Sequence, residues 1–94
     1  MWYVYLLRCS DDSLYCGITN NLLNRLNTHN RGKGSKYTRS RLPVHIAWCE
    51  ESSSRSSALK REAFIKRLSK KSKELIVKES QAKTKQVIEC EKNI

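Results

Sequence analysis

Two short strand-like segments, separated by a run of turn-forming residues, open this chain and limit what it can fold into. Residues 2–8 and 13–18 are rich in aromatic, aliphatic and β-branched side chains, which favour extended strands. Between them, Ser10-Asp11-Asp12-Ser13 is a cluster of residue types that form turns. The sequence therefore predicts an antiparallel hairpin near its N-terminus.

The register of this hairpin decides whether its two central tyrosines can work together. Side chains alternate between the faces of a strand, so a shift of one residue moves a side chain to the other face. A two-residue turn at Asp11-Asp12 would pair Tyr15 with Arg8 and leave Tyr5 and Tyr15 on opposite faces. A three-residue loop or a bulge would place both phenols on one face, and a site that uses both requires this register. The alternative is that these tyrosines only pack, as aromatic side chains on strands usually do.

A helix with two candidate functional residues follows the hairpin. Residues 21–30 place their leucines on one stripe, and Arg25 and His29, four residues apart, share a face beside it. Both polar side chains should then lie near the edge of the sheet, where a pocket can form. The alternative is a solvated arginine and a histidine at the boundary of the core. In the strand before the helix, Gly17 marks a position where backbone or ligand can approach closely.

The remainder of the chain predicts one more strand and two more helices. Residues 44–49 are typical of a strand, which two glutamates should end, and residues 57–68 and 72–79 are typical of helices. The sequence thus predicts an α+β domain over residues 1–79. Its small three-stranded antiparallel sheet is flanked by helices in the order β-β-α-β-α-α. Residues 80–94 are polar and are predicted to form a C-terminal extension, either helical or frayed.

A strongly basic balance indicates an anionic partner. The chain has 94 residues with 19 Lys and Arg against 9 acids, a formal net charge of +10, which makes nucleic acid the first candidate. No acid occurs from residue 13 to residue 49, a stretch that includes a basic, glycine-containing loop over residues 31–42. We expect this loop to bind backbone phosphates and Tyr37 to stack on an unpaired base; the alternative is a solvated, mobile segment. The expected phosphate-binding residues are Arg31, Lys33, Lys36, Arg39 and Arg41.

Other functional classes find little support in the sequence. No apolar run approaches the roughly 18 residues of a membrane span, and the N-terminus lacks the pattern of a signal peptide. The four cysteines have no C-x-x-C spacing, so reduced thiols are favoured over a zinc site. We therefore expect a monomeric cytoplasmic protein with no membrane partner.

Glu62 is a carboxylate in an unexpected place. Spacings of three and four residues put it on the same helical stripe as Ala58, Leu59 and Ile65, which should face the sheet. Burying a lone carboxylate is costly unless it is paired or coordinates a cation. Two explanations stay open: Glu62 pairs with a basic residue, for which Arg25 is a candidate, or it holds a divalent metal ion through oxygen.

Taken together, these motifs resemble a known family. The resemblance is to the GIY-YIG nuclease superfamily, most closely to its short, single-domain bacterial branch of UPF0213-like proteins, and it covers roughly residues 1–78. Two positions depart from the family pattern, because Tyr3 replaces the glycine of the first motif and Cys16 replaces the isoleucine of the second. The residues that carry the resemblance are Tyr3-Val4-Tyr5, Tyr15-Cys16-Gly17, Arg25, His29, Lys36-Tyr37-Thr38-Arg39 and Glu62.

The resemblance implies metal-dependent hydrolysis of a phosphodiester in nucleic acid, with DNA as the expected substrate of a structure-specific or repair-related endonuclease. It implies that Glu62 holds one Mg²⁺ or Mn²⁺ ion and that Arg25 braces the phosphate. Tyr5 or Tyr15 would take the proton of the attacking water, with help from His29. Because a free tyrosine has a pKa of about 10, nearby cations must favour its phenolate.

We therefore expect Glu62 to converge with the phenols and the guanidinium around a single cation. The alternative function is a nucleic-acid-binding module of the same fold with little or no activity. A further possibility is a chain that becomes active only with a protein partner.

Overall fold

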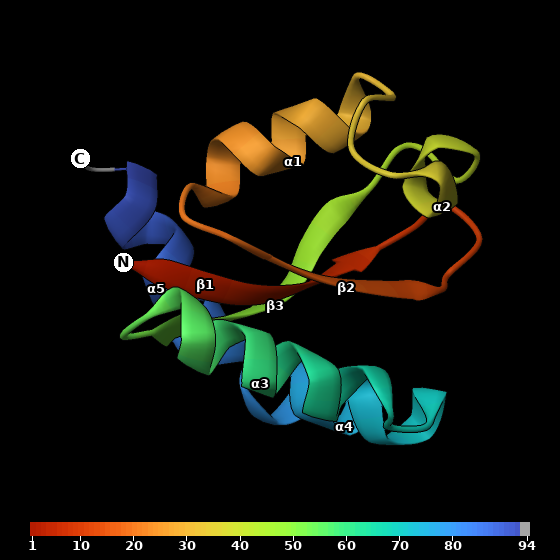
Figure 1. The fold of residues 1–94 in the computed structure, drawn as a ribbon. Helices are drawn as coiled ribbons and strands as arrows, with labels where there is room; N and C mark the ends of the chain where they lie inside the picture. Colours follow the sequence, from red (N-terminus) through yellow and green to blue (C-terminus); the bar gives the residue numbers. More distant parts are fainter. Residues whose placement is uncertain (93–94) are drawn as a thin grey trace.

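Three antiparallel strands and five helices form the part of the chain that the computed structural model describes, residues 1–92 (Figure 1). The α+β class and the three-stranded antiparallel sheet flanked by helices are confirmed, and a short helix, α2, is added within the basic loop. The elements are β1 (Trp2–Arg8), β2 (Leu14–Thr19), α1 (Leu22–Asn30), α2 (Lys36–Arg39), β3 (His45–Ser52), α3 (Arg55–Lys66), α4 (Lys70–Glu79) and α5 (Gln81–Lys92).

The hairpin adopts the register that places both tyrosines on one face. Tyr5 lies opposite Gly17, and Leu7 lies opposite Tyr15. A three-residue loop makes this pairing possible, because Asp12 takes a left-handed conformation with φ of 69° and closes the turn. Aspartate tolerates this conformation better than most residues.

The sheet has the strand order β2-β1-β3, so β1 is central and β2 is an edge strand. One face carries Tyr3, Tyr5 and Leu7 and packs against α1 and α5. The opposite face carries Val4 and Leu6 and packs against α3 and α4. Figure 1 shows α1 on one side of the sheet and α3 and α4 on the other.

Three elements have bounds that differ from those the sequence predicts. β3 does not end before its two glutamates, because Glu50 and Glu51 pair with the N-terminal half of β1. α3 begins at Arg55, and α4 at Lys70, each two residues earlier than predicted. Ser54 and Ser69 account for these starts, since each accepts a hydrogen bond from a backbone N–H of the first turn.

The C-terminal segment is helical and contributes to the core. α5 buries Val87 against the face that carries Tyr3 and Tyr5, and Thr84 accepts a hydrogen bond from the backbone of Cys49. The helical alternative for this segment therefore holds as far as Lys92, whereas residues 93–94 lie outside the described part. The domain boundary at residue 79 stays a prediction. No helix within residues 1–92 combines the length and the apolar character needed to cross a membrane.

Candidate active site

His29 is the centre of the candidate site. It lies in the last turn of α1 and is 0% exposed, so it is not a boundary residue. Its Nε2 shares a hydrogen bond of 3.1 Å with the hydroxyl of Tyr5, which reaches it from the central strand. The predicted proximity of an imidazole and a phenol is therefore present, in the buried layer between α1 and the sheet.

Thr38 holds the other side of the imidazole, and sequence reasoning gave it no role. Its Oγ1 lies 2.8 Å from His29 Nδ1 and 2.9 Å from the Ser35 hydroxyl, and its side chain is fully buried. Ser35 caps α2 by accepting a hydrogen bond from the Thr38 N–H. The signal in the sequence is the Ser-x-x-Thr spacing of a short capped helix, but only the fold shows that this helix covers His29.

Tyr15 borders the site at the edge strand β2. Its ring meets that of His29 edge-on, with centroids 5.5 Å apart, and is stacked with Tyr37 at 5.9 Å. Tyr15 is only half-buried, whereas Tyr5 is 2% exposed. Of the two phenols, Tyr15 is thus the one that solvent or a substrate can reach more easily.

Arg25 stands one turn before His29 on α1 and is half-buried. One N–H of its guanidinium donates a hydrogen bond of 3.3 Å to the carbonyl oxygen of Gly34. Its charge acts on both His29 and Tyr5. Since it forms no ion pair with a residue of the described chain, its charge is available to an anionic ligand.

The environment keeps both buried groups neutral. Burial, and to a smaller extent the charge of Arg25, lowers the pKa of His29 to about 4. Burial raises the pKa of Tyr5, and the neighbouring Arg25 offsets only part of this effect. Arg25 by itself therefore does not favour a phenolate at Tyr5, because the loss of contact with water outweighs the attraction of the guanidinium.

Two glycines make room for this cluster. A Cβ added at Gly17 would overlap the hydroxyl of Tyr5, and one added at Gly34 would overlap the ring of His29. The close approach that Gly17 predicted is thus an approach of the Tyr5 side chain. Gly34 plays the matching part in the loop and was not singled out from the sequence.

Glu62 lies on the other face of the sheet. It shares the α3 face of Ala58 and Ile65, whose side chains are buried in the core there. The Glu62 side chain is 17% exposed and forms an ion pair of 3.4 Å with Lys66, one turn along α3. The prediction of Arg25 as its partner is therefore wrong, because Arg25 is held on the side of α1.

Glu62 and the His29 cluster nevertheless border the same stretch of β2. Tyr15 contacts His29, whereas the next residue, Cys16, lies in the core against α3. Burial, followed by the nearby charge of Glu62, raises the pKa of the Cys16 thiol to about 11. β2 is an edge strand, so one of its sides has no neighbouring strand in the sheet. No three His, Cys, Asp or Glu side chains gather as a metal site within residues 1–92.

The basic loop contains the short helix α2, and only some of its side chains are available to a ligand. Tyr37 uses its ring to stack on Tyr15 and to receive the Arg41 guanidinium 3.8 Å from its centroid. Arg41 also forms an ion pair of 2.9 Å with Asp11 in the hairpin turn. These two residues therefore tie the loop to the hairpin, whereas four predicted phosphate-binding residues are exposed. Those four are Arg31, Lys33, Lys36 and Arg39.

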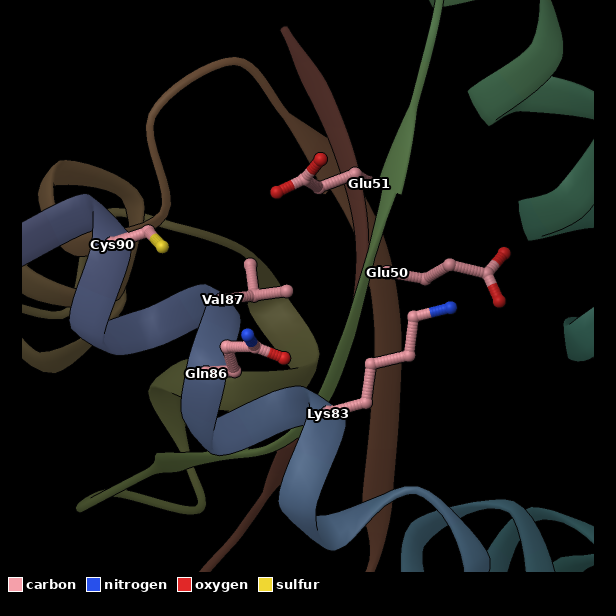
Figure 2. A pocket seen from close by; sticks show the side chains of 6 residues that line it. All are labelled: Glu50, Glu51, Lys83, Gln86, Val87 and Cys90. Carbon is pink, nitrogen blue, oxygen red and sulfur yellow. The ribbon is translucent and has the colours of Figure 1, made fainter.

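A pocket of about 290 Å³ lies between β3 and α5, away from the residues described above (Figure 2). It is lined by none of the predicted site residues, and two of its lining side chains are the carboxylates of Glu50 and Glu51. Two carboxylates would repel a phosphate group. We therefore place the candidate site at the His29 cluster and not in this pocket.

Comparison with known proteins identifies the family of this chain. The model of the GIY-YIG catalytic domain matches residues 1–75, so the chain belongs to the GIY-YIG family. Its relatives include a UPF0213 protein of Bacillus licheniformis, 51% identical over 77 residues, covering 82% of this chain and 79% of the relative. The UPF0213 protein YazA of Bacillus subtilis is 43% identical over 77 residues, covering 82% of this chain and 78% of YazA.

A solved structure is also similar. The solution structure of a UPF0213 protein from Bacillus halodurans is 39% identical and has a TM-score of 0.54, covering 83% of this chain and 84% of that one. The resemblance noted from the motifs is therefore confirmed. The GIY-YIG domain is the domain of a nuclease family, which indicates nucleic acid as the partner class.

Proposed function

We propose that this chain hydrolyses phosphodiester bonds in DNA with the help of one Mg²⁺ or Mn²⁺ ion. The observation that carries the proposal is the cluster around His29, where a guanidinium and a reachable phenol lie together at an edge strand. An arginine can brace a phosphate through its forked donors, and a phenol can handle a proton. We further propose that the protein acts as a monomer in the cytoplasm, where its buried thiols would remain reduced.

Each residue of the cluster has a separate role in the proposed reaction. Arg25 binds the phosphate and offsets the charge that develops on it. Tyr15 takes the proton of the attacking water, because it is more accessible than Tyr5. Tyr5 and Thr38 hold His29 from its two sides, and His29 supports the ring of Tyr15. Tyr5 thus becomes a positioning residue in place of the candidate base that the sequence suggested.

Glu62 is suited to a Mg²⁺ site in which the protein supplies few of the ligands. Such an ion is often held by one or two carboxylates, with waters and substrate phosphate as the other ligands. The carboxylate of Glu62 is half-buried, and its partner Lys66 has a side chain that is 52% exposed and can move aside. A divalent ion held there would supply charge stabilisation for the phosphate and the leaving oxygen.

The proposal is tested by cleavage assays on branched, nicked and single-stranded DNA with Mg²⁺ or Mn²⁺. Arg25→Ala and Glu62→Gln should each lower kcat by about 100-fold or more, because each removes a charge that acts on the phosphate. Glu79→Gln, an exposed residue at the end of α4, is the matched control for Glu62→Gln and should leave kcat unchanged.

Circular dichroism should show the same fold in all variants. Binding without cleavage in any metal would contradict the proposal and would favour the inactive nucleic-acid-binding module. Cleavage that appears only when cell extract is added would instead favour a chain that needs a protein partner.

A further inference from the structure

A second group of basic residues lies at the corner between α3 and α4. Five of the eight residues from 66 to 73 are Lys or Arg, and no acid occurs between Glu62 and Glu74. Four of the five are exposed, and the fifth is half-buried. We call this group the α3–α4 corner; it consists of Lys66, Arg67, Lys70, Lys71 and Lys73.

Ion pairs within the protein account for only part of these charges. Lys66 pairs with Glu62 at 3.4 Å. Within the described chain, Arg67, Lys71 and Lys73 form no ion pair. Lys70 makes only long ones, of 3.7 Å to Asp12 and 3.8 Å to Glu74. The first turn of α4 also contains no acid, although positive charge near the start of a helix is unfavourable. The stability of α4 therefore does not explain why its first turn is basic.

The corner and the basic loop meet at the hairpin turn from opposite faces of the sheet. The corner reaches the turn through Lys70 and Asp12, and Arg8 donates a hydrogen bond of 2.7 Å to Glu74 of α4. The loop reaches the same turn through the ion pair between Arg41 and Asp11. In Figure 1, α2 and the junction of α3 with α4 lie above and below the same end of the hairpin.

The corner also lies close to Glu62 and to the edge strand. The charges of Lys66 and Lys73 act on the thiol of Cys16 in β2, as does the charge of Glu62. Two basic surfaces thus flank the stretch of β2 that borders both the His29 cluster and Glu62. The longest extent of the molecule is 31 Å, which corresponds to about nine base pairs at roughly 3.4 Å each.

We propose that the α3–α4 corner is a second phosphate-binding surface, which holds the backbone of duplex DNA on the side of the sheet opposite the basic loop. The proposal rests on the function proposed above, because it assigns the second surface to the same DNA. Duplex DNA is the fitting partner, because it presents a dense row of phosphates to surfaces on both sides of the edge strand.

The test measures equilibrium binding of a labelled duplex of about 12 base pairs in EDTA, over a series of NaCl concentrations. The corner variant combines Arg67→Gln, Lys71→Gln and Lys73→Gln. The control variant also removes three positive charges, but from the end of α4 and from α5. Its substitutions are Lys78→Gln, Lys83→Gln and Lys85→Gln. Figure 2 shows Lys83 beside β3, at the pocket described above. Thermal melting checks that both variants are folded.

The corner variant should bind about tenfold or more weakly near 0.1 M salt. Its plot of log K against log salt should be shallower by about two to three units, since each phosphate contact contributes about 0.9. The control variant should lose less than about twofold. Equal losses in the two variants, or no loss in the corner variant, would overturn the proposal.

Because binding is measured without metal, the two proposals can fail separately. A wild-type protein that binds through the corner but never cleaves would refute the proposed nuclease activity. The proposed role of the corner would still stand. A wild-type protein that cleaves, with a corner variant that binds like the control, would refute only the corner. A wild-type protein that does not bind the duplex would refute both.

Discussion

At the scale of single residues, the site depends on which groups form hydrogen bonds with the two nitrogens of a buried imidazole. A neutral histidine has one donor and one acceptor nitrogen, and which is which depends on its partners. Both partners of His29, the hydroxyls of Tyr5 and Thr38, can donate or accept. The network can therefore be satisfied in either tautomer, and a charged ring with two donors is not required.

Thr38→Val should lower the stability of the fold, because it keeps the shape of the side chain but leaves Nδ1 of His29 buried without a partner. We expect the free energy of unfolding to fall by about 1–3 kcal/mol. Thr38→Ser keeps the hydroxyl and should lose less. Urea denaturation of the two variants measures this difference, and equal stability of the two would show that the hydrogen bond contributes nothing.

The low pKa of His29 predicts a pH dependence of stability. Between pH 6.5 and about 4, the unfolded chain binds a proton at His29 that the folded protein does not bind. The free energy of unfolding should therefore decrease as the pH falls through this window, by up to about 3 kcal/mol. Above pH 6.5 the residue should have no such effect.

The measurement compares wild type with His29→Gln by urea denaturation at several pH values. Carboxylates titrate in both proteins, so only the difference between the two curves reports on His29. Parallel curves from pH 7 to pH 4 would contradict the buried, neutral assignment.

At the scale of elements, each face of the sheet is completed by helices from different parts of the chain. α1 and α5 cover the face with the tyrosines, although they are separated in sequence by β3 and three other helices. α5 is therefore part of the core rather than an accessory segment, even though its composition is polar.

Truncation after Ser80 should destabilise the protein, because it removes the burial of Val87 and Ile88 against the sheet. A loss of about 3 kcal/mol or more is expected from two such side chains. Val87→Ala should cost about 1–3 kcal/mol, whereas Lys85→Ala, its exposed neighbour, should stay within about 0.5 kcal/mol. Chemical denaturation measures all three, and an unchanged truncated chain would support the predicted domain boundary at residue 79.

At the scale of the whole molecule, the net charge of +10 has a spatial pattern. The basic loop and the α3–α4 corner approach the same hairpin turn, and the acids Asp11 and Asp12 in that turn bind one residue from each. These contacts hold the two basic segments on either side of β2. Part of the positive charge thus lies around the edge strand that borders the candidate site.

DNA binding should depend steeply on salt. If about six phosphates are contacted, affinity should fall by about a thousandfold between about 50 and about 200 mM salt, because each contact releases condensed counterions. Fluorescence anisotropy of a labelled duplex in EDTA measures this dependence. An affinity that hardly changes over this range would show that contacts between the basic surfaces and phosphates are not the source of DNA binding.

The sequence alone determined the features that depend on local patterns. Alternating aromatic and aliphatic residues and the turn cluster predicted the hairpin, and helical spacing predicted that Arg25 and His29 share a face. The spaced motifs also identified the family. These predictions succeed because the side-chain periods of strands and helices are properties of the backbone and can be recognised within a few residues.

The tertiary structure decided what depends on contacts between distant residues. It selected the hairpin register, brought Thr38 and Gly34 against His29, and paired Glu62 with Lys66 instead of Arg25. It also gave Tyr5 a raised pKa where a lowered one was expected. None of these follows from local spacing, because each depends on which elements pack on which face of the sheet and on how far water is excluded from the groups between them.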